Sequence, residues 1–243
     1  GGRDYCAKQE IKMSKLIAEE RTIVVPGEKL ATGMEYLPGN GAFREGDDIY
    51  SCQLGLVNVS GRFVKVIPLT GKYNPREGDI IIGKISDVSF GMWFVNIGCA
   101  YLACLNVREV PEFIDKGADL SNYYDFNEVI IAQVIKVVRS KDINLTLKGQ
   151  GLRKIKGGKI IEVTPSKVPR IIGKQGSMIS MIKEHTKCNI VVGQNGNIWI
   201  KGDNVENEVK ATEVILKIEN ESHTHGLTDT IKKALEEGIE NGL

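Results

Sequence analysis

A short glycine-containing stretch holds the residue types best suited to bind a ligand. Residues 168–179 read Val-Pro-Arg-Ile-Ile-Gly-Lys-Gln-Gly-Ser-Met-Ile, which predicts a short helix, a Gly-x-x-Gly turn and a second helix. Gly173 and Gly176 let the turn fold tightly and keep side chains away from an approaching backbone. Lys174 adds a positive charge and Gln175 adds hydrogen-bond donors. The amide N–H groups that open the second helix point outward at the positive end of its dipole. These groups together suit a nucleic-acid phosphate backbone.

The charge distribution indicates a local anion-binding surface around this turn. The 243-residue chain has a net charge of only +1. Residues 151–187 nevertheless contain nine Lys and Arg residues and two Glu residues, a net charge of +7. Residues 202–243 contain ten acidic and four basic residues, a net charge of −6. Arg170 lies in the basic segment, and we predict that it supports the phosphate contacts. Two plainer interpretations stay open: a solvated charged face, and a helix–turn–helix packing corner.

The segments around the turn alternate between strand and helix patterns. Strands are predicted at residues 159–163, 188–192 and 197–201, and the Asn-Gly pair at 195–196 predicts a turn between the last two. The helix at residues 177–186 has Met178, Ile179 and Ile182 on one side. This order resembles a type I KH domain, whose loop clamps about four backbone nucleotides. In some KH domains this loop contacts protein instead, so the resemblance alone does not establish RNA contact.

A further helix is predicted at residues 205–218. Its pattern is given by Val205, Val209, Thr212 and Leu216, at spacings of four, three and four. Asp203 and Glu206 stand at the cap and cap-plus-three positions of a capping box.

Residues 74–149 predict five closely spaced strands, with a longer connection before the fourth. The strands are expected at 79–88, 93–97, 101–107, 129–138 and 142–148. Trp93, Val95 and Ile97 alternate with Phe94 and Asn96, so we predict that Trp93 is a core residue. This pattern favours a small OB-type barrel. It resembles an S1 domain through Gly83, Phe90-Gly91, Phe94-Val95-Asn96-Ile97, and residues 103–107, 134–137 and 143–148.

The S1 resemblance implies an RNA-binding surface built from two aromatics, a histidine, an aspartate and an arginine. Phe90 and Phe94 fall on the aromatic positions. Asn106, Val138 and Asp142 stand at the other three, so this sequence departs from the family there. The barrel is therefore expected either to bind RNA weakly or to form a wall around an RNA path. The residues predicted to take part are Phe90, Phe94, Arg139 and Lys141. For Phe94, a half-buried strand aromatic with no ligand is an equally open interpretation.

The N-terminal part of the chain is dense in strand and turn signals. Strands are predicted at residues 22–25, 48–52, 54–57 and 63–69, with no helix longer than a turn or two after residue 21. The tetrapeptide Arg-Glu-Gly-Asp occurs at residues 44–47 and 76–79, and each copy is predicted to turn the chain into an apolar strand.

The sequence thus predicts a multidomain protein that combines β and α+β architecture. The expected parts are a tail at residues 1–12, a small β domain at 13–73, a five-stranded OB-type S1 barrel at 74–149, a KH domain at 150–222, and a C-terminal helix at 223–243. In that last helix, Ile231, Leu235 and Ile239 lie on one side.

Composition and missing motifs exclude several classes of function. The chain is 42% hydrophobic and 26% charged, as in folded soluble proteins, and no run of about 18 apolar residues could span a membrane. No signal peptide is visible, and the five scattered cysteines favour a reducing, cytoplasmic environment. His223 and His225 could approach Cys188, but nothing supplies a full metal-ligand set. No catalytic residues or cofactor motif are recognised, so we expect neither enzyme activity nor a cofactor.

The order of the three domains resembles the RNA-binding cap subunits of the archaeal exosome, of the Rrp4 type. Besides the Gly-x-x-Gly turn, the resemblance rests on three segments: Val25-Pro26-Gly27-Glu28, residues 192–200 and Gly226-Leu227-Thr228-Asp229. The resemblance implies three cap subunits on a hexameric ring of RNase PH-like phosphorolytic subunits. The N-terminal domain would dock on the ring, and the cap would feed the 3′ end of single-stranded RNA into it without cutting.

Two alternatives come from other functional classes. One is a fragment of a polynucleotide phosphorylase-like enzyme, but that family carries its KH domain before its S1 domain and this chain has the reverse order. The other is a free-standing S1/KH regulator of translation or RNA stability.

Overall fold

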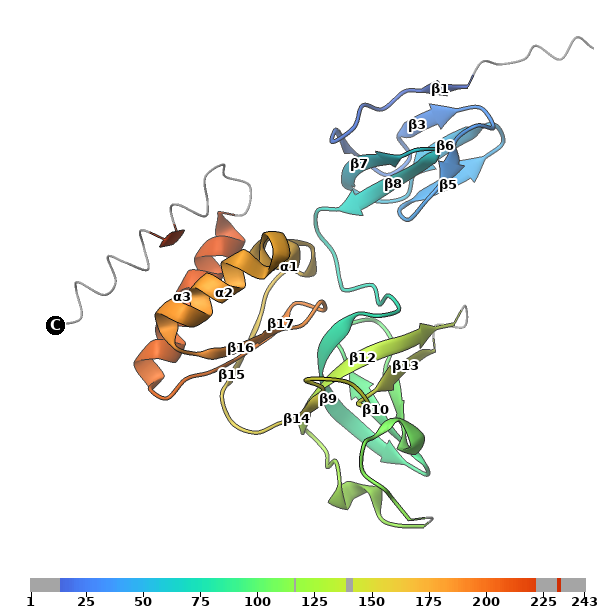
Figure 1. The fold of residues 1–243 in the computed structure, drawn as a ribbon. Helices are drawn as coiled ribbons and strands as arrows, with labels where there is room; N and C mark the ends of the chain where they lie inside the picture. The colour runs from blue at the N-terminus through green and yellow to red at the C-terminus, as the bar shows by residue number, and fades with distance from the viewer. Residues whose placement is uncertain (1–13, 116, 139–141, 222–230, 233–243) are drawn as a thin grey trace, which may run out of the picture. The chain divides into compact units, whose positions relative to one another are not determined.

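The computed structural model describes residues 14–115, 117–138, 142–221, 231 and 232 (Figure 1). The predicted N-terminal tail and most of the predicted C-terminal helix lie outside these residues. The chain divides into two compact units, residues 1–71 and 72–243. Within the part that the structure describes, no helix has the length and apolar character needed to cross a bilayer.

The first unit is built from short strands, as the sequence predicts. One sheet has the order β1-β3-β6-β5 and the other has the order β2-β7-β8-β4. The strands are β1 (Lys15–Leu16), β2 (Ile23–Val24), β3 (Lys29–Thr32), β4 (Leu37–Pro38), β5 (Ala42–Glu45), β6 (Asp48–Ser51), β7 (Gly55–Ser60) and β8 (Phe63–Pro68). In β8, Val64 and Val66 enter the core while Phe63, Lys65 and Ile67 face outward. Both Arg-Glu-Gly-Asp copies turn the chain into a strand, with positive φ at Gly46 and Gly78.

The second unit begins with a closed five-stranded barrel. Its strands are β9 (Ile80–Ser89), β10 (Met92–Asn96), β11 (Ala103–Asn106), β12 (Val129–Val137) and β13 (Ile143–Thr146). They pair in the order β13-β11-β10-β9-β12, and pairing of β12 with β13 closes the ring. The β11–β13 pair is parallel and the others are antiparallel. This is the strand order of an OB barrel, which confirms the predicted fold.

The barrel core follows the alternation in the sequence. Trp93, Val95 and Ile97 are fully buried, and the indole nitrogen of Trp93 donates hydrogen bonds to the backbone oxygens of Leu120 and Tyr124. The connection before β12 contains two short 3-10 helices, η1 (Val107–Glu109) and η2 (Leu120–Asn122). The segment after β13 contributes a further strand, β14 (Arg153–Ile155), which pairs with β12.

The KH-like part has a three-stranded antiparallel sheet in the order β15-β17-β16, covered by helices on one face (Figure 1). Its elements are β15 (Lys159–Glu162), η3 (Pro165–Lys167), α1 (Val168–Ile172), η4 (Lys174–Gly176), α2 (Ser177–Thr186), β16 (Asn189–Val192), β17 (Asn197–Lys201) and α3 (Val205–Asn220). This order confirms the predicted domain. Met178 and Ile182 of α2 are buried against the sheet, and Ile231 packs into the same core.

The buried face of α3 shares only Thr212 with the predicted stripe. Val205, Val209 and Leu216 are exposed, with 75%, 43% and 39% of their surface accessible. The helix instead buries Ala211, Thr212, Ile215 and Ile218. The two apolar stripes have similar spacing, so periodicity alone could not choose between them. The predicted capping box is also absent: Asn204 occupies the N-cap without a side-chain hydrogen bond, and Glu208 accepts from the amide of Gly202.

The hairpin turn between β16 and β17 joins the KH-like domain to the barrel. Asn195 is buried, and its side-chain nitrogen donates to the backbone oxygens of Ile82 (2.8 Å) and Ile97 (2.9 Å). Its side-chain oxygen accepts from the Ile82 amide at 3.2 Å. Trp199 packs beside this contact against Ile82 and Ile131. These contacts give the two domains a fixed seam within the second unit.

Candidate nucleic-acid interface

The Gly-x-x-Gly turn joins α1 to α2 in a conformation that requires glycine. Gly173 ends α1 with φ 76° and ψ 178°, and Gly176 precedes α2 with φ 79° and ψ 10°. Gln175 between them also has a positive φ, of 54°. The amide of Gly173 donates to Pro169 O, and the amide of Gly176 donates to Gly173 O. The backbone therefore reverses direction within a few residues, as the sequence predicts.

The two glycines differ in the space around them. A Cβ on Gly173 would lie 2.7 Å from Met178 Cβ and 2.8 Å from Met178 N, so this position has no room for a side chain. A Cβ on Gly176 would meet only Ile179 Cγ2, at 3.9 Å. Gly173 therefore supports packing of the turn onto α2, while Gly176 leaves an open surface beside it.

The groups that could hold a phosphate lie on the outside of the turn. Lys174 and Gln175 are exposed, and so is Arg170 on α1. Gly176 is the N-cap of α2, and among the described residues no side chain caps this helix. The positive end of the α2 dipole therefore faces the same exposed turn. The turn and the adjacent helix α1 thus expose two cations, an amide side chain and a helix N-terminus.

On the barrel, Phe94 belongs to a row of outward-facing residues set by strand register. Phe94 pairs with Cys104 of β11, Cys104 with Asn144 of β13, and Asn144 with Lys136 of β12. Phe94 is partly buried, while Asn144 and Lys136 are exposed. Burial and the charge of Asp142 raise the pKa of the Cys104 thiol, so it stays protonated at neutral pH. This row offers an aromatic face, an amide and a cation.

The sequence pattern does not indicate Asn144 and Lys136 on this face, or Asn195 at the domain seam. The first two become neighbours of Phe94 only through pairing of three strands. Asn195 precedes Gly196, and this Asn-Gly pair predicts only a hairpin turn. Nothing in the local pattern indicates that the Asn195 side chain is a buried hydrogen-bond donor. Alternation in the predicted strands could have placed Asn144 and Phe94 on outer faces, but it could not have given their register.

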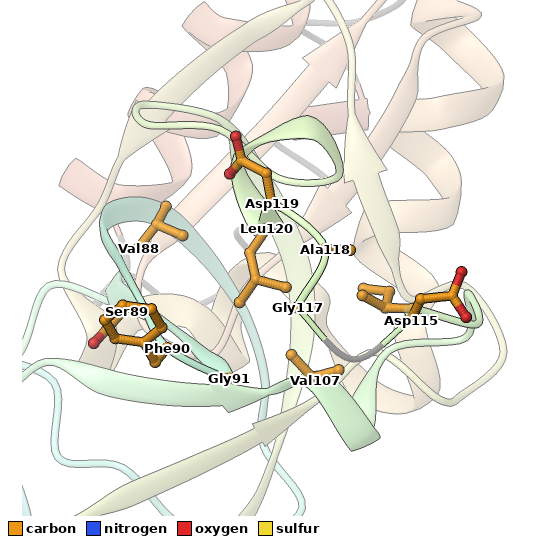
Figure 2. A pocket seen from close by; sticks show the side chains of 11 residues that line it. Val88, Ser89, Phe90, Gly91, Val107, Asp115, Gly117, Ala118, Asp119 and Leu120 are labelled. Carbon is orange, nitrogen blue, oxygen red and sulfur yellow. The ribbon is translucent and has the colours of Figure 1, made fainter.

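Of the remaining predicted site residues, Phe90 is described and belongs to the barrel rather than to the KH-like domain. Phe90 lies at the tip of the β9–β10 hairpin and is fully exposed, beside a pocket of about 680 Å³ (Figure 2). Arg139 and Lys141 lie outside the described residues. His223 and His225, the two histidines that could approach Cys188, lie outside them as well. In the part of the chain that is described, no group of three or more His, Cys, Asp or Glu side chains is placed to hold a metal.

Two family models match the chain. The model described as "KH domain" matches residues 158–206, which contain the Gly-x-x-Gly turn. The model described as "Exosome RNA binding protein RRP4 N-terminal domain" matches residues 21–70, within the first unit.

Curated proteins named "Exosome complex component Rrp4" resemble nearly the whole chain. The Pyrococcus horikoshii protein is 48% identical over 227 residues, covering 92% of this chain and 85% of that one. The Methanothermus fervidus protein is 46% identical over 226 residues, covering 93% of this chain and 100% of that one. A crystal structure of a protein described as exosome complex RNA-binding is 36% identical, with a TM-score of 0.63, and covers 70% of this chain and 98% of its own. Because such relatives are matched over most of their own length, this chain belongs to the Rrp4 family of exosome complex components.

Proposed function

We propose that this chain is a non-catalytic RNA-binding cap subunit of an exosome, which captures single-stranded RNA and guides its 3′ end into a phosphorolytic ring. The observation that carries the proposal is the exposed Gly-x-x-Gly turn, with Arg170 and Lys174 beside it, in a domain matched by the KH family model. Names of the relatives support the exosome assignment.

We propose a cytoplasmic location, where the free cysteines Cys52, Cys99, Cys104 and Cys188 would stay reduced.

The turn would hold the sugar-phosphate backbone. Gly176 leaves the backbone open to close approach, and the N-terminus of α2 places a partial positive charge behind it. Lys174 and Arg170 would neutralise phosphates, and Gln175 would donate hydrogen bonds to them. These contacts read no base edges, so binding would depend on salt and show only modest sequence selectivity.

The barrel would contribute a second, weaker part of the RNA path. Phe94 exposes part of its ring, on which a base can stack, and Lys136 lies in the same cross-strand row. We also assign Arg139 and Lys141 to this path. Phe90 was predicted for it too, but its pocket carries the carboxylates of Asp115 and Asp119, which repel phosphates. The proposed path therefore leaves Phe90 out.

The first unit would dock on the RNase PH-like ring, with three copies of the chain per complex. Its β2-β7-β8-β4 sheet exposes large apolar side chains on its outer face, namely Ile23, Leu37, Phe63 and Ile67, with 59%, 43%, 47% and 51% of their surface accessible. Strand pairing keeps Ile23 in line with Ile67 through Leu56, and Leu37 opposite Phe63. Contiguous apolar surface of this kind marks a protein interface.

The decisive test replaces Gly176, because its surroundings tolerate a side chain. Gly176→Asp should lower the affinity for a short fluorescent single-stranded RNA at moderate salt by about tenfold, since it places a carboxylate beside the bound phosphates. Gly176→Asn is the matched control, because asparagine has a similar shape, tolerates a left-handed φ and carries no charge. Its affinity should stay within about threefold of the parent chain. Unchanged RNA affinity in the Asp variant, measured by fluorescence anisotropy, would remove the turn from the RNA path.

A further inference from the structure

The pocket beside Phe90 has an apolar lining and an acidic rim. It lies between the β9–β10 hairpin loop and the segment that leads from η1 to η2. Val88, Val107, Ile114 and Leu120 supply the apolar lining. Figure 2 shows the Phe90 ring on one side and Asp115 on the other, with Leu120 and Val107 between them.

The loop that carries Phe90 is held in place while its ring stays accessible. The amide of Val107 donates to Gly91 O at 3.1 Å, which ties the hairpin tip to the start of η1. Phe90 itself has a relative accessibility of 102%. Because the backbone of this loop is anchored, only the Phe90 side chain has to become ordered when a ligand binds.

The charges around this pocket are unfavourable for RNA. Among its described lining residues the only charged side chains are those of Asp115 and Asp119. Hydrogen bonds from the Ser121 hydroxyl and amide lower the pKa of Asp119, so this carboxylate is ionised at neutral pH. In the sequence, residues 107–128 contain six acidic residues and two basic ones, Arg108 and Lys116. A polyanion that entered here would meet net repulsion, whereas a cation would be attracted.

The same segment exposes further aromatic surface. Phe113 and Phe126 have relative accessibilities of 88% and 59%. Aromatic side chains next to carboxylates suit a partner that combines apolar or aromatic side chains with Lys or Arg, because the rings bind both apolar groups and cations.

We infer that this pocket docks a basic segment of a partner protein, with one of its apolar or aromatic side chains seated beside Phe90 and its cations near Asp115 and Asp119. The site is separate from the proposed RNA path, so RNA binding by the KH turn and partner binding by the barrel can succeed or fail independently. A nucleobase in the same pocket is the competing occupant, and the charge of the lining disfavours it.

The test uses the full chain labelled with fluorine at its six Phe residues, with resonances assigned by single Phe→Leu variants. The probe is a short peptide that contains one Trp flanked by Arg and Lys, and the matched peptide replaces the cations with Glu. The basic peptide should shift the Phe90 resonance saturably, and the acidic peptide should not. A short single-stranded RNA should move Phe94 and leave Phe90 in place.

Variants then separate the pocket from general surface charge. Phe90→Ala should weaken binding of the basic peptide at least about fivefold, and Asp115→Asn with Asp119→Asn should weaken it about three- to tenfold. Phe43→Ala and Glu45→Gln are the controls, because these exposed residues belong to the first unit and lie outside the pocket lining. The inference is overturned if the basic peptide leaves Phe90 unshifted, if the controls weaken binding as much as the pocket variants, or if RNA shifts Phe90 in its place.

Discussion

At the scale of single residues, the two glycines of the turn have different physical reasons to be glycine. Gly173 combines a φ/ψ pair that only glycine adopts easily with a Cβ position already occupied by Met178. Gly176 has only the left-handed φ, and its surroundings are open. The first residue therefore fixes the shape of the turn, and the second keeps its outer surface accessible to a phosphate.

We expect alanine substitutions to separate these two roles. Gly173→Ala should destabilise the KH domain by about 2–4 kcal/mol, through backbone strain and overlap with α2. Gly176→Ala should cost about 1 kcal/mol, because only the positive φ opposes it. Hydrogen exchange of the buried Ile182 and Ile215 amides reports on this domain alone. Equal loss of protection in the two variants would contradict the assignment.

At the scale of elements, the β16–β17 turn connects two domains as well as two strands. Asn195 makes three hydrogen bonds to the backbone of β9 and the residue after β10, and Asn197 donates a further bond to Ile82 O. Trp199 extends the contact with apolar surface, and its indole nitrogen donates to Gly157 O at 2.8 Å. The seam positions the KH turn relative to the barrel because polar and apolar contacts both act there.

Asn195→Ala should therefore loosen the seam without unfolding either domain. The loss of three hydrogen bonds to buried groups should cost about 2–3 kcal/mol, partly offset because Asn197 still donates to Ile82 O. The Ile82 amide loses its side-chain acceptor, so its hydrogen exchange should accelerate at least about tenfold. Asn144→Ala, on the exposed face of β13, is the control and should leave this rate unchanged. Retained protection at Ile82 would show that the apolar contacts alone hold the domains together.

At the scale of the whole molecule, the two units carry different proposed binding surfaces. The proposed RNA contacts lie in the second unit, and the exposed apolar sheet face lies in the first. Within the described residues, no cluster of metal ligands is present. In the proposed function, the second unit would bind RNA and the first unit would dock on a ring, whose subunits would carry out phosphorolysis.

The full chain, mixed with single-stranded RNA and inorganic phosphate, should bind the RNA and release no nucleoside diphosphate. Its affinity should fall as salt rises, with a slope of about −0.7 in log K against log salt for each phosphate contact. Thin-layer chromatography of the products and anisotropy at several salt concentrations measure the two quantities. Phosphate-dependent release of nucleotides would instead favour the polynucleotide phosphorylase-like alternative.

The sequence by itself determined the features that depend on neighbouring residues. The strands of the barrel, both helices around the turn and the glycine corner itself were predictable, because hydrophobic alternation and a requirement for positive φ are local properties. Even the burial of Trp93 followed from alternation along one strand. The KH and barrel folds were then predictable from the order of these elements.

Only the tertiary structure decided which of two similarly spaced stripes of α3 is buried, because that choice depends on the residues packed against the helix. It also assigned Asn195 to the domain seam and set Phe94 in line with Asn144 and Lys136. Phe90 came to line a pocket together with two carboxylates from a segment about 25 to 30 residues further along the chain. Each of these features arises from groups that are distant in sequence and meet only through strand pairing or domain contact. Local propensity does not predict these contacts, because packing and long-range hydrogen bonds determine which distant residues come together.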